Sequence, residues 1–228
     1  MSTRRQPPPP APARSGRRGP PAAPSPLSGR RAQAARNDQL ILESARAVFL
    51  DDPGAPITAV AKHAGVGISA LYTRYGSKEE LLRTLCNDGL QRFVGETQAA
   101  LADDRDPWTV FSDYMRRAVD ADTSSLTLAL AGKFTPTAEM FALAERANEL
   151  SSRLFDRVKG VLRPGLEVHD ISLVFELVAA VKFSDRARTE QLRRRYLAVI
   201  LDGLCAPDGD PLPGPPPTWQ EINERWAA

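Results

Sequence analysis

The sequence has few cysteines and histidines, no long apolar run and no segment that alternates like a surface strand. Cys86, Cys205, His63 and His169 are its only residues of these two types and lie far apart, so no metal-ligand spacing and no Ser/His/Asp arrangement can be assembled. We therefore expect no enzyme activity, no metal and no cofactor. No run approaches the roughly 20 apolar residues that span a bilayer, so no membrane partner is expected. The missing alternation predicts an all-α protein.

Acidic residues are absent from residues 1–36, which hold eight arginines, so the remainder of the chain carries a net negative charge. Proline, alanine, glycine and serine surround a single large aliphatic residue, Leu27, and we expect this tail to be disordered because it cannot bury enough apolar surface. The arginines nearest the first predicted helix, Arg30, Arg31 and Arg36, are expected to contact DNA as a basic arm. Those between Arg4 and Arg18 are interpreted as a solvated extension.

The stretch Ile57–Leu81 organises the rest of the chain. Val60, Ala61 and Ala64 form one apolar face at helical spacing, and Gly65 follows where a left-handed turn is needed. Val66 and Leu71 resume the apolar face beyond that turn. This order of helix, glycine turn and helix predicts a helix-turn-helix over about residues 57–76, a motif that presents its second helix to the DNA major groove.

The flanks of this motif complete a small helical domain, predicted over residues 37–90. An apolar stripe predicts a first helix from about Asp38 to Leu50, ended by a turn cluster of Asp, Pro and Gly. The second and third helices are expected over residues 57–64 and 68–75. Ser77 followed by Glu80 is a capping box that opens a fourth helix.

The segment AGVGISALYTRYGSKEELL resembles the DNA-binding domain of the TetR family of transcriptional regulators, which carries A-G-V-x-x-x-x-L-Y-x-x-F/Y-x-S/N-K-E-x-L. Ten positions lie in register: Ala64, Gly65, Val66, Leu71, Tyr72, Tyr75, Ser77, Lys78, Glu79 and Leu81. The resemblance covers about residues 36–85 and is architectural beyond them. Two positions depart from it: Ala55-Pro56 stand where the family often has Ser or Thr before its second helix, and Gly67 replaces the usual Ser that opens the third.

The resemblance and the helical spacing together give candidate DNA contacts. Leu71 points to the core, and Tyr72, about 100° around the helix, can face the groove. The resemblance implies that Tyr72 and Tyr75 contact phosphate or line the core, and that Lys78 binds a phosphate at a helix N-terminus. Arg74 is the only long basic side chain of the third helix. The full predicted set is Thr58, Gly67, Ile68, Ser69, Ala70, Tyr72, Thr73, Arg74, Tyr75 and Lys78.

A second helical domain, for ligand binding and dimerisation, is predicted over residues 91–205. Its helices are expected from Pro107, from Asp122-Thr123, and over 137–162, 170–183 and 185–204. Residues 171–183 are apolar around the helix circumference, broken chiefly by Glu176 and Lys182, which predicts cover on more than one side. The resemblance implies that the last two helices form a four-helix homodimer interface, with the core of one chain as the alternative. The predicted interface residues are Phe175, Val178, Ala179, Leu192, Tyr196, Val199 and Ile200.

Aromatic residues of the second domain are candidates for an effector pocket, although aromatics at helical spacing also form plain core. They are Trp108, Phe111, Tyr114, Phe134, Phe141 and Phe155. Residues 206–228 are predicted to be a proline-rich tail with a short docking helix, because Trp219, Ile222 and Trp226 share one face.

These observations predict a homodimeric TetR-type regulator, a repressor that a small-molecule effector releases from a palindromic double-stranded operator. Domain closure on the effector would change the separation of the two recognition helices. The expected location is the bacterial cytoplasm, in association with the nucleoid. Two alternatives stay open: an architectural DNA-binding protein without an effector pocket, and a helical ligand- or partner-binding protein that has lost specific DNA readout.

Overall fold

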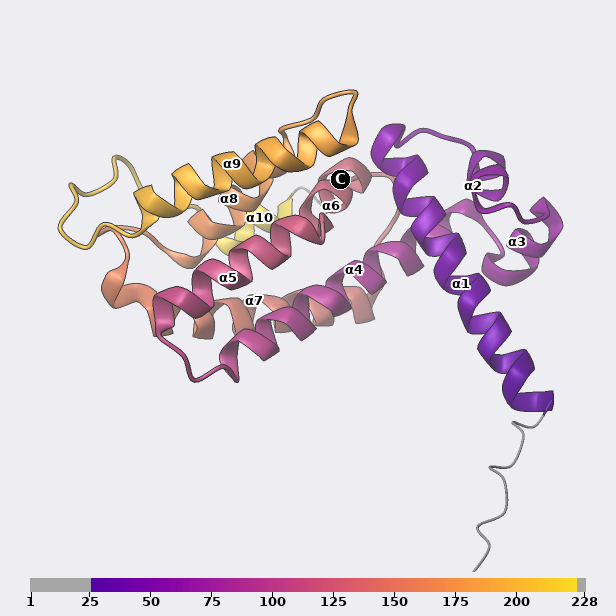
Figure 1. The fold of residues 1–228 in the computed structure, drawn as a ribbon, viewed down its shortest axis with the longest axis horizontal. Coiled ribbons are helices and arrows are strands. Elements are labelled where there is room, and N and C mark those ends of the chain that lie inside the picture. Colours follow the sequence, from indigo (N-terminus) through magenta and orange to yellow (C-terminus); the bar gives the residue numbers. More distant parts are fainter. Residues whose placement is uncertain (1–25, 225–228) are drawn as a thin grey trace, which may run out of the picture. The chain divides into compact units, whose positions relative to one another are not determined.

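The computed structural model describes residues 26–224, and these residues form helices joined by turns, without a strand (Figure 1). The all-α prediction is confirmed. Most of the predicted tail (residues 1–25) and Trp226 lie outside the described residues. The elements are α1 (Pro26–Asp51), α2 (Ile57–Ala64), α3 (Ile68–Tyr75), α4 (Lys78–Leu101), α5 (Pro107–Asp120), α6 (Thr123–Leu130), α7 (Ala138–Val158), a 3₁₀ turn η1 (Lys159–Val161), α8 (Val168–Ala179), α9 (Arg186–Leu204) and α10 (Trp219–Glu224).

Residues 1–38 and residues 39–228 form two units, and the packing described here is that of the second. Its first part, which we call the head, comprises residues 39–90. Ile41, Ala45 and Phe49 of α1 pack with buried residues of α2, α3 and α4 in one core. Phe49 and Leu71 are fully buried, so the apolar stripe of α1 and the apolar face of the helix-turn-helix meet as the sequence predicts.

Local signals fix the ends of the short helices. Gly65 adopts the left-handed conformation (φ 67°) after α2, and the Val66 N–H donates to the Ala61 carbonyl over 3.0 Å. This bond is the helix-ending contact that a left-handed glycine permits. The Ser77 hydroxyl accepts from the Glu80 N–H at 3.0 Å and begins α4. The Glu80 side chain turns instead to Arg83, so one half of the predicted capping box is present.

Two helix limits and one domain boundary differ clearly from the sequence prediction. α1 begins at Pro26 rather than about Asp38, because proline suits the first helical position and the Ala, Gln and Arg residues that follow are good helix formers. α4 runs unbroken across residue 90, where the sequence suggested a domain boundary. α8 ends at Ala179, short of residue 183, where Arg193 binds the carbonyls of Ala179 and Val181.

The remaining helices form a body around a second core. In Figure 1, α5 lies between α4 and α9, with α7 beside α4 and α8 beside α9. Phe111, Tyr114 and Met115 of α5 are buried there against α7, α8 and α9. None of the described helices is long and apolar enough to cross a membrane.

Helix α6 connects the two cores. Leu126 and Leu130, together with Phe134 just beyond the helix, are buried in the core of the head rather than that of the body. Phe134, predicted as a pocket residue, is therefore a core residue of the head. A displacement of α6 would have to disturb head packing, because protein interiors are close-packed.

Candidate nucleic-acid interface and effector pocket

Helix α3 divides cleanly into a buried and an exposed face. Leu71 and Tyr75 are buried and Ile68 is half-buried against the core. The other residues of the helix point to solvent: Ser69, Ala70, Tyr72, Thr73 and Arg74. Gly67 before the helix and Thr58 on α2 are also exposed. The head thus exposes one face of α3 to solvent, as readout of a major groove requires.

Two predicted contacts have a different position. Tyr75 is only 7% exposed and belongs to the core of the head, which removes its ring from the DNA-facing set. Lys78 is half-buried: its ammonium donates to the Gly54 carbonyl at 3.1 Å and lies 5.3 Å from the centre of the Phe49 ring. Lys78 therefore joins α4 to the turn between α1 and α2, and two of its three donors remain for a phosphate.

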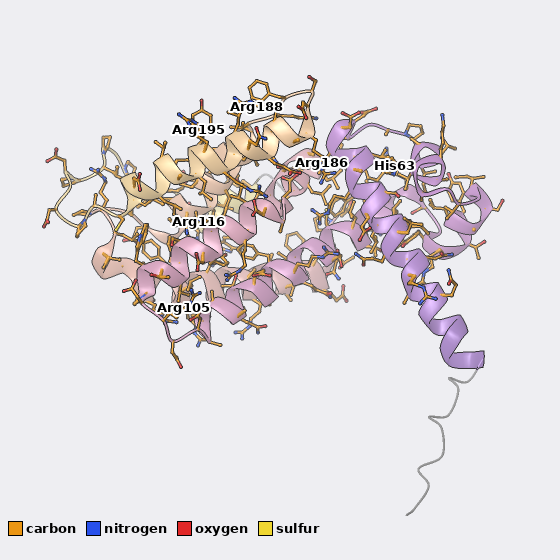
Figure 2. All side chains as sticks on the ribbon, viewed as in Figure 1. His63, Arg105, Arg116, Arg186, Arg188 and Arg195 are labelled. Carbon is orange, nitrogen blue, oxygen red and sulfur yellow. The ribbon has the colours of Figure 1, made fainter. Side chains whose placement is uncertain are left out.

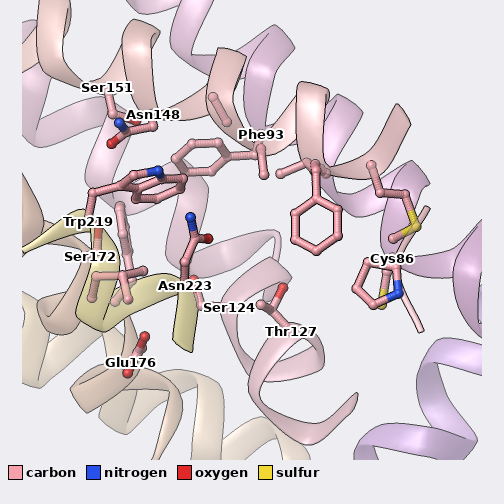
Figure 3. Close-up of a pocket in the computed structure, with 18 residues that line it drawn as sticks. Cys86, Phe93, Ser124, Thr127, Asn148, Ser151, Ser172, Glu176, Trp219 and Asn223 are labelled. Carbon is pink, nitrogen blue, oxygen red and sulfur yellow. The ribbon is translucent and has the colours of Figure 1, made fainter. Parts of the chain in front are cut away.

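A pocket of about 230 Å³ lies in the body, between α4, α6, α7, α8 and α10 (Figure 3). Leu90 and Phe93 of α4, Met140 and Phe141 of α7, and Phe175 of α8 give it apolar walls. Its polar lining is made of Ser124, Thr127, Asn148, Ser151, Ser172, Glu176 and Asn223. This volume exceeds the roughly 150 Å³ of an engineered apolar cavity that binds benzene, so the pocket has room for more than one aromatic ring.

Residues 41–85 match the model of the bacterial regulatory proteins of the tetR family. A TetR transcription regulatory protein from Mycobacterium vanbaalenii is 25% identical, with 77% of this chain and 98% of that chain aligned at a TM-score of 0.53. Residues 41–85 therefore form a DNA-binding domain of the TetR family. The chain is a DNA-binding transcriptional regulator of the TetR type, with its helix-turn-helix in the head.

Two further solved TetR regulators share the fold. PfmR from Thermus thermophilus is 24% identical (72% of this chain and 98% of that chain aligned, TM-score 0.53). LfrR from Mycobacterium smegmatis, solved in complex with proflavine, is 19% identical (74% and 97% aligned, TM-score 0.56). A comparison with curated proteins found no match.

Most of the aromatic residues that the sequence predicts as pocket-lining do not line the pocket of about 230 Å³. Phe141 does. Phe111, Tyr114 and Phe155 are buried in the core of the body, around a small void of about 30 Å³. Trp108 packs on the outside of that core. The aromatic residues at helical spacing therefore form the core of the body, and the pocket is lined mainly by other residues.

Two features of the sequence could have indicated the observed lining. Glu176 interrupts the apolar run of residues 173–179 in α8, and it lies in the pocket wall. Trp219 and Ile222 share a face of α10 and also line the pocket. Asn148 and Phe93 carried no signal that separates them from other residues of their helices.

The predicted dimer face is out of phase on α8. Phe175 and Val178 are buried within the body, at 6% and 1% exposure, and cannot reach a second chain. Leu177 is 65% exposed instead, and Ala180 is exposed beside it. On α9, Tyr196 and Val199 are exposed and Leu192 and Ile200 are intermediate, as is Ala179 at the end of α8. Arg188 and Arg195 project from the same helix away from the body (Figure 2).

Asp122 joins the head to the body. It has a left-handed backbone (φ 52°), which is uncommon for a residue other than glycine. Its carboxylate accepts from Arg193 Nη1 at 2.6 Å, and the carbonyls of Ala121 and Asp122 accept from Arg46 of α1 at 3.3 and 3.4 Å. Burial lowers the pKa of the Arg46 guanidinium. Lys182 donates to the Leu50 carbonyl at 2.7 Å, at the end of α1 where carbonyls lack helical partners.

Cys86 lines the pocket, and burial raises the pKa of its thiol to about 12. We predict that iodoacetamide alkylates Cys86 very slowly at pH 8, where only about one thiol in ten thousand would be ionised, against about a quarter of free cysteine. The rate should rise about tenfold per pH unit up to pH 10. Mass spectrometry of the Cys86 peptide measures it, with the urea-unfolded chain as the control. Rapid alkylation of the folded chain at pH 8 would contradict the burial of this thiol.

Proposed function

We propose that this regulator is a homodimeric repressor that binds a palindromic operator through α3 and leaves it when a small molecule fills the pocket of the body. The observation that carries the proposal is the double role of α6. Leu126 and Leu130 pack in the core of the head, while Ser124 and Thr127 line the pocket. One short helix therefore packs in the core of the head and also lines the candidate effector pocket.

Operator readout by α3 would depend on hydroxyl groups and apolar contacts. The exposed face offers Ser69, Thr73 and Tyr72 as hydrogen-bonding groups and Ala70 as an apolar contact for thymine methyl groups. Arg74 is its one long basic side chain. Residues 37–90 contain five basic and seven acidic residues, so the arginines of residues 1–36 would supply much of the nonspecific attraction to DNA.

Dimerisation through α8 and α9 would bring two heads to one operator. A two-fold dimer presents two recognition helices and reads an inverted repeat, with half-sites separated by about one helical turn. The apolar residues available on the outward faces are Leu177 of α8, Ala180 just after that helix, and Leu192, Tyr196 and Val199 of α9. Exposed aliphatic side chains on adjacent helices support an interface, since a monomer gains nothing from them.

Replacing Leu177 or Val199 by Glu is expected to convert the dimer to a monomer, because each would place a charge in the apolar centre of the interface. Size-exclusion chromatography with light scattering measures the mass. Leu40→Glu, which alters an aliphatic of the head that is 45% exposed, is the control and should remain dimeric. A dimer that survives both Leu177→Glu and Val199→Glu would show that the chains associate elsewhere.

Ligand control would run through the contacts around Asp122. A molecule against Ser124 and Thr127 bears on α6, whose first residue follows Asp122. Asp122 in turn holds Arg193 of α9, and its carbonyl holds Arg46 of α1. An effector would shift the equilibrium only by its differential affinity for the two arrangements of these contacts. LfrR, which has the same fold and was solved with proflavine, supports a small molecule as the effector.

The two alternatives predict different DNA binding. An architectural protein would bind DNA with a steep salt dependence and no sequence preference, through the arginine tail. A protein that has lost readout, which the lack of Asn, Gln and Lys on α3 favours, would bind no operator even at low salt. Either result would distinguish the corresponding alternative from a repressor that acts at the nucleoid in the bacterial cytoplasm.

Nuclease protection of the DNA upstream of the chain's own gene, at about 150 mM salt with excess competitor DNA, tests the proposal. We expect a protected inverted repeat. Protection that competitor DNA abolishes completely would support the architectural alternative at that locus.

A further inference from the structure

Helix α10 is built into the wall of the candidate effector pocket, although it lies more than 100 residues after α4, which also lines this pocket. Trp219, Ile222 and Asn223 all line the cavity. Figure 3 shows the Trp219 indole beside the Phe93 ring, between Asn148 and Ser151 on one side and Ser172 and Asn223 on the other. Without α10 the pocket would be open to solvent along this wall.

Several contacts hold α10 in place. The His169 ring stacks on Trp219, with centroids 5.9 Å apart and planes 22° apart. The His169 Nε2 atom lies 3.1 Å from the Asn148 side-chain oxygen, so Trp219 is tied to a second pocket residue. The Glu221 carboxylate accepts from the Thr218 N–H and hydroxyl at 2.7 and 2.8 Å, which fixes the start of the helix.

The segment that leads to α10 is also fixed. Arg163 donates to the carbonyls of Gly203 and Asp210 at 3.2 and 3.0 Å and so binds the start of the linker. Five prolines follow between residues 211 and 217, and each restricts its φ angle to about −65°. A short, stiff linker of this kind delivers α10 to one place on the body.

The lining of the pocket is polarised. Cys86 stands at one end, whereas Glu176 stands at the end near α10 (Figure 3). Glu176 carries the only carboxylate among the described lining residues, and no Lys or Arg among them lines the cavity. A carboxylate can accept from several donors at once and repels an anion. Trp219 and Phe93 offer ring faces, which attract cations and stack with other rings.

We propose that α10 is a specificity wall of this site, which takes an aromatic cation of about two fused rings, with the rings against Trp219 and Phe93 and the cationic group toward Glu176. This inference rests on the proposed function in one respect: the aromatic cation would be the effector that releases the repressor. The size follows from the cavity of about 230 Å³.

Three naphthalene probes of similar size and different charge test the ligand class on the full chain by isothermal calorimetry: 2-naphthylmethylammonium, 2-naphthylmethanol and 2-naphthoate. We expect the cation to bind about tenfold more tightly than the alcohol, and the carboxylate not to bind. Glu176→Gln should bring the cation and the alcohol within about threefold. Glu149→Gln, which removes a surface carboxylate of α7, is the charge-matched control and should leave the preference unchanged. Equal binding of the naphthoate, or no binding of any probe, would overturn the assignment.

Two variants test the wall itself: Trp219→Ala, and a chain that ends at Pro217. Both should weaken binding of 2-naphthylmethylammonium at least about tenfold while circular dichroism retains the helical melting transition. Unchanged affinity in both would show that α10 is not part of the site. DNA protection by the same preparations reports separately on the regulator function, so a failure of the ligand assignment and a failure of the proposed repressor are distinguishable.

Discussion

Replacing Arg193 by Ala is expected to lower the free energy of unfolding by about 3 kcal/mol, which for a chain of this size corresponds to roughly 10 °C in Tm. The Arg193 side chain is 8% exposed and makes three bonds, to the Asp122 carboxylate and to the carbonyls of Ala179 and Val181. Its loss leaves a partly buried carboxylate and two carbonyls without donors, and such groups are costly. Thermal denaturation followed by circular dichroism measures the change.

The neighbouring arginine is a matched control. Arg194 also pairs with an aspartate of the α5 end, Asp120, at 2.7 Å, but both side chains are largely exposed. Arg194→Ala should leave Tm unchanged because exposed ion pairs contribute little. Asp122→Asn, which keeps a residue type that tolerates the left-handed backbone, should lose less than Arg193→Ala. Equal decreases in Tm for Arg193→Ala and Arg194→Ala would show that the contacts around Asp122 stabilise the fold no more than an exposed ion pair does.

Replacing Tyr72 by Ala is expected to weaken operator binding at least about 30-fold with no change in Tm. Its side chain is 46% exposed on the outward face of α3, and loss of one good DNA contact is worth about 1–3 kcal/mol in each of two half-sites. Fluorescence anisotropy of labelled operator DNA measures the affinity. Tyr72→Phe separates the hydroxyl group from the ring.

Leu71 gives the opposite result at the adjacent position. It is fully buried in the core of the head, so Leu71→Ala should lower the free energy of unfolding by about 2–5 kcal/mol. Its effect on DNA affinity should follow the fraction of folded protein. If Tyr72→Ala lowers Tm as much as Leu71→Ala does, then Tyr72 is structural and the outward face of α3 has been misassigned.

The helix-turn-helix could be predicted closely because its signals are local. Gly65, Gly76 and Ser77 end or begin helices through their own backbone or hydroxyl bonds, so the limits of α2 and α3 agree with the prediction. Tyr75 was ambiguous in the sequence, since a tyrosine suits both a core and a phosphate contact. Its four-residue spacing from Leu71 places it on the buried face.

The body was less predictable because its signals are not local. Helix α8 is apolar on nearly every side, so the sequence carries no phase that distinguishes Phe175, which faces the core, from Leu177, which faces outward. The pocket combines residues from α4 to α10, and no periodicity shows which aromatics surround a cavity and which fill a core. The contacts of Arg193 and Lys182 join residues more than 70 positions apart and leave no local pattern.

The proposed function depends above all on a two-fold dimer that reads an inverted repeat through α3. Selection of bound sequences from random duplex DNA by the wild-type chain, with Tyr72→Ala in parallel, tests it most directly because it needs no knowledge of the target gene. We expect the wild-type chain to enrich an inverted repeat with half-sites about one helical turn apart, and Tyr72→Ala to enrich none. Enrichment of no sequence, or of a single half-site without a repeat, would contradict it.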